Sequence, residues 1–402
     1  MKILYFSPHP HLKLQASTGY GTHMREMIRA FEELGHEVKF FIGGETKSSP
    51  TPSVQSDSPQ TNLWKSLLKR FVPHIVWETI KDAQLIRTDN QRGQVLERMC
   101  LDFAPDVIYE RSHYGMASGV MIAQKLGIHH VLEVNSPNVQ ERIQLSGTSW
   151  LSGKAKKADN YIFSQSDHVL TVSTRLAEML DIPAVSKDWS VTPNAIRPGQ
   201  ELQESETKTR SDLGINESTF LVGFIGSIFE WHGVDLLIDA IGFLRAKNVN
   251  VSALIVGDGV IKDDLIQQSQ TLGIKNHIVW TGTVPHDQIH GLGKLCDCLI
   301  MPKTNMYGSP VKIFEYALCH KPVIAPDASP VREVMENNAH GLIVPPDASE
   351  ITRAIVHLKN NSQLGAEYAN NWRQKVLCQH TWKQNAAVAL KLVRGHSNNE
   401  KR

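Results

Sequence analysis

No run of 18 or more apolar residues occurs in the 402-residue sequence, so we expect no membrane-spanning helix. The sequence begins with a short apolar segment that ends before Pro8, so it lacks the longer apolar core expected of a signal peptide. An excess of one charge is also absent, with 42 Lys and Arg residues against 41 Asp and Glu residues, which argues against a nucleic-acid partner. We therefore expect a cytoplasmic protein that binds no nucleic acid.

Cysteine is scarce and has no informative spacing. The five cysteines are an odd number, and Cys296 and Cys298 alternate on one expected strand, which fits neither a disulfide framework nor a zinc motif. We interpret them as reduced packing residues, with a metal site as the alternative. What is present is the composition of a globular protein, 41% hydrophobic and 21% charged, at a length that favours two domains.

Short apolar segments alternate with helical patterns in both halves of the chain, which predicts two doubly wound α/β domains with parallel sheets. The expected strands are residues 2–7, 38–42, 106–109, 129–135, 168–172, 190–194, 220–225, 251–256, 278–281, 298–301 and 322–325. The clearest helices are residues 19–35, 115–126 and 234–246, and Ser173 is the expected cap of another. The polar residues 197–211 are the expected linker. We therefore place one domain at 1–197, a second at 198–375, and a helix in 376–402 that returns toward the first domain.

One loop and the helix after it form the main candidate site. Ser309 and Pro310 precede a helix whose first amides, at Val311 and Lys312, have no intrahelical partner and attract phosphate. A lysine in a first helical turn is unfavourable for the helix dipole, so Lys312 needs another reason to be there. Glu315, one turn deeper, suits ribose hydroxyls. The alternative is an exposed Lys–Glu pair beside buried apolar residues.

The loops after other strands carry further candidates. Arg111 and His113 follow the strand at 106–109, at the edge where open α/β sheets bind ligands, although a packing role for His113 stays open. Gly19, Tyr20 and Gly21 form a glycine loop that lacks the third glycine of a dinucleotide fingerprint, so it predicts a ligand near the backbone more than it predicts NAD.

Two polar or amphipathic segments lie near the end of the second strand. Residues 48–62 have almost no apolar content and are expected to lack fixed structure. Residues 64–73 combine apolar side chains with cations, which predicts either contact with a membrane surface or lipid-bearing acceptor, or a helix packed on its own domain.

Together these segments resemble the family-four retaining glycosyltransferases of the GT-B fold. The matching pieces are residues 19–21, 35–38, 132–137, 191–194, 226–233, 256–259, 308–315 and 341–345. The resemblance implies two Rossmann-like domains that face each other across a cleft. It also implies that the C-terminal domain holds a nucleotide-sugar donor and the N-terminal domain an acceptor.

The resemblance assigns roles to individual residues. Glu315 matches the second glutamate of the family's Glu-x7-Glu motif, which engages the donor ribose, while Tyr307 replaces the first and Lys312 resembles the lysine of a Ser-Pro-x-Lys variant. Ser227 and His232 replace the family's Arg and Lys, which leaves Lys312, helix amides and a protonated His232 to neutralise the diphosphate. The expected donor-binding residues are Gly226, Ser227, His232, Gly257, Asp258, Ser309, Val311, Lys312 and Glu315, the catalytic candidates are Lys312, Arg111 and His113, and the acceptor or phosphate loop is Gly19, Tyr20 and Gly21.

The implied function is sugar transfer from a nucleoside-diphosphate sugar to a glycan, lipid-linked or small-molecule acceptor by a retaining hexosyltransferase. No Asp-x-Asp motif is present to hold a metal, so we expect neither metal nor cofactor. Membrane association through residues 64–73 is a further expectation. The alternatives are a degenerate GT-B subunit that binds nucleotide sugar or a partner without catalysis, and a nucleotide-sugar 2-epimerase.

Overall fold

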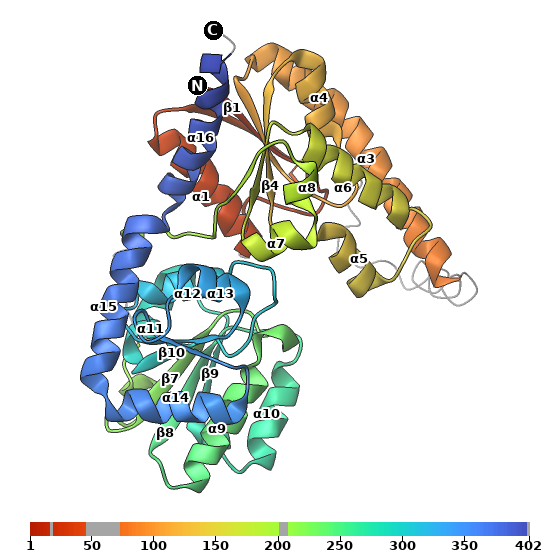
Figure 1. The fold of residues 1–402 in the computed structure, drawn as a ribbon. Coiled ribbons are helices and arrows are strands. Elements are labelled where there is room, and N and C mark those ends of the chain that lie inside the picture. The colour runs from red at the N-terminus through yellow and green to blue at the C-terminus, as the bar shows by residue number, and fades with distance from the viewer. Residues whose placement is uncertain (17–18, 46–72, 201–207, 400–402) are drawn as a thin grey trace. The chain divides into compact units, whose positions relative to one another are not determined.

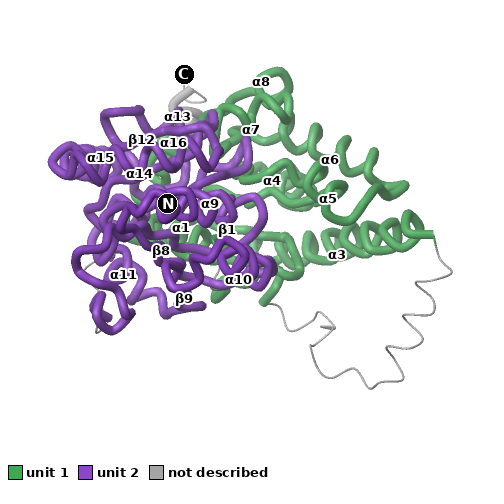
Figure 2. Tube along the Cα trace, turned by 90° about the horizontal axis from the view of Figure 1, so that it is seen from below, with its two compact units in different colours: residues 1–192, 383–402 green, residues 193–382 purple. Residues whose placement is uncertain are grey.

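The computed structural model describes residues 1–16, 19–45, 73–200 and 208–399. The segments at 48–62 and 64–72, for which a loop and an amphipathic contact were expected, lie outside these residues. The chain divides into two compact units, residues 1–192 with 383–402 and residues 193–382 (Figure 2). This division falls a few residues before the expected boundary at 197.

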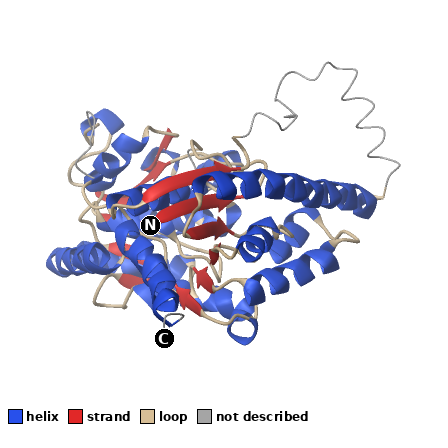
Figure 3. Ribbon diagram, turned by 90° about the horizontal axis from the view of Figure 1, so that it is seen from above, coloured by secondary structure: helices blue, strands red, loops and turns tan. Residues whose placement is uncertain are grey.

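Unit 1, residues 1–192 with 383–402, contains a six-stranded sheet in which every pair of neighbours is parallel (Figures 1 and 3). The strand order is β2-β1-β3-β4-β5-β6. The strands are β1 (Lys2–Ser7), β2 (Glu37–Ile42), β3 (Val107–Arg111), β4 (His129–Val134), β5 (His168–Thr171) and β6 (Trp189–Val191). The chain reverses its direction of travel across the sheet between β1 and β3, and such switch points are where open α/β sheets bind ligands.

Helices cover both faces of this sheet, and Ser173 caps α7 as expected, because its Oγ accepts a hydrogen bond from the Leu176 amide at 3.0 Å. The helices are α1 (Gly19–Glu33), α3 (His74–Phe103), α4 (Ser118–Leu126), α5 (Asn138–Ser146), α6 (Ser152–Gln165), α7 (Thr174–Met179), α8 (Ile182–Val185) and α16 (Trp382–Asn399). The long helix α3, which runs beside α4 (Figure 1), had no counterpart in the sequence prediction. Its sequence lacks a continuous apolar pattern because the part up to Arg92 buries charged residues, among them Asp82, Asp89 and Arg92 itself, and apolar residues are buried only near its C-terminal end.

Unit 2, residues 193–382, has the same architecture with the strand order β12-β11-β10-β7-β8-β9, again all parallel. The strands are β7 (Phe220–Ile225), β8 (Val251–Val256), β9 (Ile278–Gly282), β10 (Cys298–Ile300), β11 (Val323–Pro326) and β12 (Leu342–Val344). Here the switch point lies between β7 and β10. Two parallel doubly wound sheets confirm the predicted fold class.

The core of unit 2 has two layers because successive residues of a strand face opposite sides of the sheet. Leu254 on β8 packs in one cluster with α11, α12 and α15, whereas Ile255 packs in the other with α9, α10 and α14. The helices are α9 (Val234–Ala246), α10 (Lys262–Thr271), α11 (Ile289–Leu295), α12 (Val311–Ala317), α13 (Ser329–Val334), α14 (Ala348–Asn360) and α15 (Ser362–Gln379). Four short 3-10 helices are η2 (Ser211–Leu213), η3 (Glu230–His232), η4 (Lys275–His277) and η5 (His286–Gln288).

The C-terminal region differs in detail from the single helix expected in 376–402. The end of α15 is followed by Thr381, which pairs with Ile196, and α16 then begins at Trp382. Among the described residues, no helix combines the length and apolarity needed to cross a bilayer.

Candidate active site

In unit 2, Lys312 projects from the first turn of α12 onto the end of β7. A Cβ at Gly226, which has φ 147°, would collide with the aliphatic part of Lys312, so glycine is needed there. The helix is fixed in place because the Tyr316 hydroxyl accepts a hydrogen bond from the Ile225 amide at 2.9 Å and donates one to the Ile225 carbonyl at 3.0 Å. The position of the ammonium group therefore follows from buried contacts one turn away.

The Lys312 ammonium meets His232 at this switch point. Nζ lies 3.0 Å from Nε2 of His232, and Nδ1 of the same ring lies 2.6 Å from the carbonyl oxygen of Ser227. Because a carbonyl only accepts, Nδ1 carries the proton and Nε2 accepts from the ammonium. Burial, followed by the charge of Lys312, lowers the pKa of His232 to about 4. The expectation of a protonated His232 is therefore wrong for this arrangement: Lys312 is the charged group and His232 orients it.

Burial shifts the pKa values of Lys312 and Glu315 in the directions that favour their neutral forms. It lowers the pKa of Lys312 to about 8, against the opposing charge of Glu315. It also raises the pKa of Glu315, although His286 and Lys312 act the other way. No described residue donates a hydrogen bond to the Glu315 carboxylate. A cation and an unsatisfied carboxylate thus lie one turn apart on the same short helix.

The backbone turns after β7 and β8 pack directly on each other. A Cβ at Gly257, where φ is 133°, would overlap the carbonyl oxygen of Gly226, and one at Gly259 would overlap that of Ile228. Asp258 accepts hydrogen bonds from the Gly259 amide at 2.8 Å and from the Lys262 ammonium at 3.3 Å. These contacts, the amide first, lower the pKa of Asp258. The side chain of Asp258 thus stabilises the turn locally.

The remaining expected donor residues lie in the loop before α12. The Oγ of Ser309 accepts a hydrogen bond from the Asn194 amide at 2.9 Å, and its carbonyl accepts one from the Asn194 side chain at 2.5 Å. These bonds attach the loop to the start of unit 2. Pro310 is the residue before the helix instead of a member of its first turn, so Val311 supplies the first helical amide. Ser227 is exposed, and its described contact is the carbonyl bond to His232.

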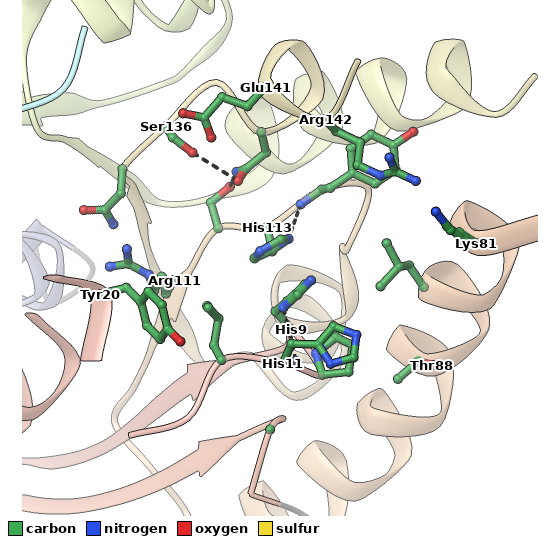
Figure 4. Close-up of a pocket in the computed structure, with 18 of the residues that line it drawn as sticks. His9, His11, Tyr20, Lys81, Thr88, Arg111, His113, Ser136, Glu141 and Arg142 are labelled. Atoms are coloured by element: carbon green, nitrogen blue, oxygen red, sulfur yellow. Dashed lines mark hydrogen bonds between the residues drawn. The ribbon is translucent and has the colours of Figure 1, made fainter. Parts of the chain in front are cut away.

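Unit 1 contains a cavity of about 1250 Å³ at its own switch point (Figure 4). Loops after β1, β3 and β4 line it together with α3 and α5. The lining includes His9, His11, Leu12, Lys13, Tyr20, Lys81, Gln84, Leu85, Thr88, Gln91, Arg111, Ser112, His113, Tyr114, Asn135, Ser136, Asn138, Glu141, Arg142 and Leu145. The structure thus brings together Arg111, His113 and Tyr20 from the predicted set.

The other members of the expected glycine loop do not form a loop over a ligand. Gly19, Tyr20 and Gly21 belong to the first turn of α1, and only Tyr20 lines the cavity. Gly21 is buried, and a Cβ there would collide with the carbonyl of Ala16. Close packing of the chain that enters α1 explains this glycine, and a role of the three residues in acceptor or phosphate binding stays a prediction.

Arg111 enters the cavity with a buried carboxylate behind it. Its Nη1 lies 3.4 Å from Oε2 of Glu133, whose other oxygen forms a short contact with His23. Burial alone raises the pKa of Glu133, but His23 and Arg111 outweigh it and lower the pKa to about 2. The carboxylate therefore stays ionised and compensates the charge of Arg111.

His113 has a partner that the sequence did not indicate. Its ring stacks on that of His9, with centroids 3.7 Å apart and an angle of 19° between the planes. Burial, then the neighbouring His9 and Arg111, lowers the pKa of His113 well below its usual range. His9, Lys81 and Arg142 were not predicted because the loop after β1 and the helices α3 and α5, which carry them, show no motif, and only the fold places them at the same cavity as His113.

The comparisons with known proteins agree with this architecture. Residues 17–200 match the family model described as Glycosyltransferase Family 4, and residues 205–375 match Glycosyl transferases group 1. The chain is 22% identical to the alpha-D-kanosaminyltransferase of Streptomyces kanamyceticus over 54% of its length and 57% of that relative. It thus spans little more than half the length of this curated relative.

Solved structures share the fold over nearly the whole chain. HepE of Anabaena, crystallised with UDP, superposes with a TM-score of 0.69 at 20% identity, covering 97% of this chain and 100% of that one. Sucrose-phosphate synthase of Thermosynechococcus elongatus gives a TM-score of 0.72 at 16% identity, with 99% of each chain covered. The chain thus resembles the glycosyltransferases of these two families, with one family model matching each half of the chain, and it has the two-domain Rossmann-like GT-B fold.

Proposed function

We propose that this protein transfers a glycosyl group from a nucleoside-diphosphate sugar to a hydroxyl-bearing acceptor. The observation that carries the proposal is the cluster at the unit 2 switch point, where Lys312, oriented by His232, lies one turn from the carboxylate of Glu315. A diphosphate needs a cation and a ribose needs a hydrogen-bond acceptor, and this short helix provides both.

The chemistry places one demand on this cluster. When the bond between the sugar C1 and the phosphate oxygen breaks, its electron pair stays on the diphosphate. The acceptor oxygen forms the new bond to C1, and its proton passes to the departing diphosphate oxygen. Preorganised cations and amides stabilise that growing charge best, because they need no reorientation during the reaction. Lys312 is the group that would do so here, and the amide of Val311 would assist it.

Several finer features belong to the same proposal. We infer retention of the anomeric configuration, a hexosyl donor and independence of a divalent metal, on the strength of the resemblance and the cation at Lys312. HepE has also been crystallised with UDP-glucose, which supports a uridine or related nucleotide sugar as the donor. The replacement of the two expected cations by Ser227 and His232 supports one rival: a subunit that binds nucleotide sugar without transferring it.

A ligand panel tests the proposal. UDP-, GDP- and ADP-sugars should be compared by thermal unfolding, since a ligand that binds only the native state raises the unfolding temperature by mass action. We expect one nucleotide series to raise it, Lys312→Ala to reduce the shift, and nucleoside diphosphate to be released in the presence of acceptor. Absence of a shift with every sugar nucleotide would overturn the proposal. A shift without release across neutral and anionic acceptors would favour the non-catalytic subunit.

A further inference from the structure

The cavity of unit 1 contains two imidazole rings whose hydrogen-bonding roles are fixed by the backbone. Nδ1 of His9 accepts a hydrogen bond from the amide of His11 at 3.2 Å, and Nδ1 of His113 accepts one from the amide of Tyr114 at 2.8 Å. An amide only donates, so each neutral ring must carry its proton on Nε2. Neither Nε2 has a hydrogen-bond partner among the described residues. The stack therefore presents two N–H donors from rings 3.7 Å apart (Figure 4).

The helix α3 holds both loops that carry the rings. Arg92 donates to the carbonyl of Pro8, next to His9, and to that of Gly43 at 2.6 Å. Asp89 accepts from the amides of Ala117 and Ser118 at 2.9 and 3.1 Å, which fixes the end of the His113 loop. The two donors are thus preorganised by buried polar contacts rather than placed on free loops.

The same loop receives a third attachment from α3. The Tyr114 hydroxyl donates to Asp82 at 2.5 Å, and Asp82 is almost fully buried. Because Tyr114 directly follows His113 and its amide holds the imidazole, this contact fixes the ring orientation as well as the backbone.

The charged groups around the cavity cancel. Lys81 and Arg142 bind the buried Glu78 at 2.8 and 2.6 Å, and Arg142 also contacts the buried Asp82 at 3.0 Å. Arg111 is held by Glu133 in the same way. The two remaining charged residues of the lining, Lys13 and Glu141, have opposite signs. The cavity offers many hydrogen-bond donors but no net positive charge. An anion that entered it would therefore lose its hydration without a compensating charge.

Protonation of the stacked rings would not restore a positive charge at neutral pH. Burial, then His11 and Arg92, lowers the pKa of His9 to about 3, and the pKa of His113 is lowered in the same direction. Apart from His11, Pro10 and Gly44, the rest of the lining consists of neutral amides, hydroxyls, leucines and tyrosines, the mixture that suits hydroxyl-rich rings with apolar faces.

We propose that His9 and His113 together form a double hydrogen-bond donor that selects an uncharged glycan as the ligand of this cavity. The inference rests on the proposed function, because it assigns the glycan as the glycosyl acceptor. The volume of about 1250 Å³ exceeds that of an ordinary small-molecule pocket, so we expect an oligosaccharide rather than a single sugar.

The test uses the full chain on an array of neutral oligosaccharides and matched phosphorylated, sulfated and uronate-bearing forms. We expect retention on neutral glycans and weaker retention on their anionic counterparts. Preferential retention on the anionic forms, or no retention on any glycan, would overturn the proposal. The thermal shift with sugar nucleotides, measured on the same preparation, reports the proposed function separately, since the proposed donor-binding residues lie in unit 2.

Variants separate hydrogen bonding from packing. Phe at position 9 or 113 keeps a stacking ring without an N–H, whereas Gln keeps a donor near the position of Nε2. We expect His9→Phe and His113→Phe each to weaken binding of the retained glycan roughly 3- to 10-fold, and the Gln variants to restore most of it. His357→Asn, on the exposed surface of α14, is the matched control. Equal binding by folded Phe variants and wild type would show that the stack only packs, and would remove the proposal.

Discussion

The two switch points of this protein are built alike and charged differently. In unit 1, the switch point lies between the loops that follow the neighbouring strands β1 and β3. In unit 2, it lies between the loops that follow β7 and β10. In unit 2, Lys312 contacts a neutral imidazole, and no carboxylate of the described residues lies within ion-pairing distance of it. In unit 1, Arg111, Lys81 and Arg142 each contact a buried carboxylate.

This difference separates two uses of cationic side chains. A cation compensated by a buried carboxylate orients a neighbouring chain and offers hydrogen bonds, but adds little net potential. A cation that contacts a neutral ring keeps its charge available for a ligand, although burial, opposed only by the charge of Glu315, lowers its pKa. We therefore expect unit 2 to respond strongly to charge changes and unit 1 to changes in hydrogen-bond donors.

Removal of the unit 2 cation should have the largest effect. We expect Lys312→Ala to lower turnover roughly 100- to 1,000-fold, or about 2.7 to 4 kcal/mol, with a smaller rise in the KM for donor, because the contact strengthens as the leaving group gains charge. The measurement is initial-rate kinetics at saturating acceptor, with circular dichroism to check folding. Lys247→Ala, on an exposed residue at the end of α9, is the control. Turnover within a few-fold of wild type in a folded Lys312→Ala protein would transfer the role to the helix amides.

The close contact between the unit 2 loops should appear in stability. Gly257→Ala places a Cβ against the carbonyl of Gly226 at a φ of 133°, so we expect the free energy of unfolding to fall by about 1–3 kcal/mol. Gly153→Ala in α6 is the contrast, because nothing lies within 4 Å of its Cβ, and it should be neutral or stabilising by up to about 1 kcal/mol. Denaturant titration measures the free energy of unfolding of both variants. Equal changes in the two variants would contradict the close packing at Gly257.

The pH dependence of the reaction should show whether the charge of Lys312 is needed. Lys312, with a pKa of about 8, is charged below that pH and neutral above it. We expect kcat/KM for donor to be level below pH 8 and to fall about tenfold per pH unit above it, since this parameter reports the free enzyme. Lys312→Arg should remove the alkaline decline because a guanidinium stays protonated, even if its overall rate is lower. An unchanged decline in that variant would assign the titration to another group.

The smallest expected effect concerns the carboxylate. Glu315→Gln should weaken donor binding roughly 5-fold, because a hydrogen bond to a charged acceptor is stronger than one to an amide oxygen by about 1 kcal/mol. Calorimetric titration with the preferred sugar nucleotide measures the change, and Glu217→Gln, which is exposed in the same unit, is the control. Unaltered affinity would make Glu315 a structural residue rather than the ribose ligand.

Much of the architecture was accessible from the sequence. Strands 2–7, 220–225 and 251–256 and the helix 234–246 were predicted at their observed bounds, because continuous apolar runs and helical apolar spacing are local signals. The helix α3 was not predicted, because the part that holds the neighbouring loops buries charged residues, which give no apolar pattern in the sequence. The donor-side candidates on α12 were found from the helix start, whereas the role of His232 needed its contact with Lys312.

The sequence by itself determined that two parallel sheets form and that ligands approach the loops after their strands, since both follow from the order of apolar segments. Only the tertiary structure decided which groups meet there. His9 and His113 are more than a hundred positions apart, yet β1 and β3 pair directly and bring their loops together. The tautomer and charge of His9 and His113 also depend on the tertiary structure, because burial, neighbouring charges and single backbone amides set them. No residue pattern in the sequence records these contacts.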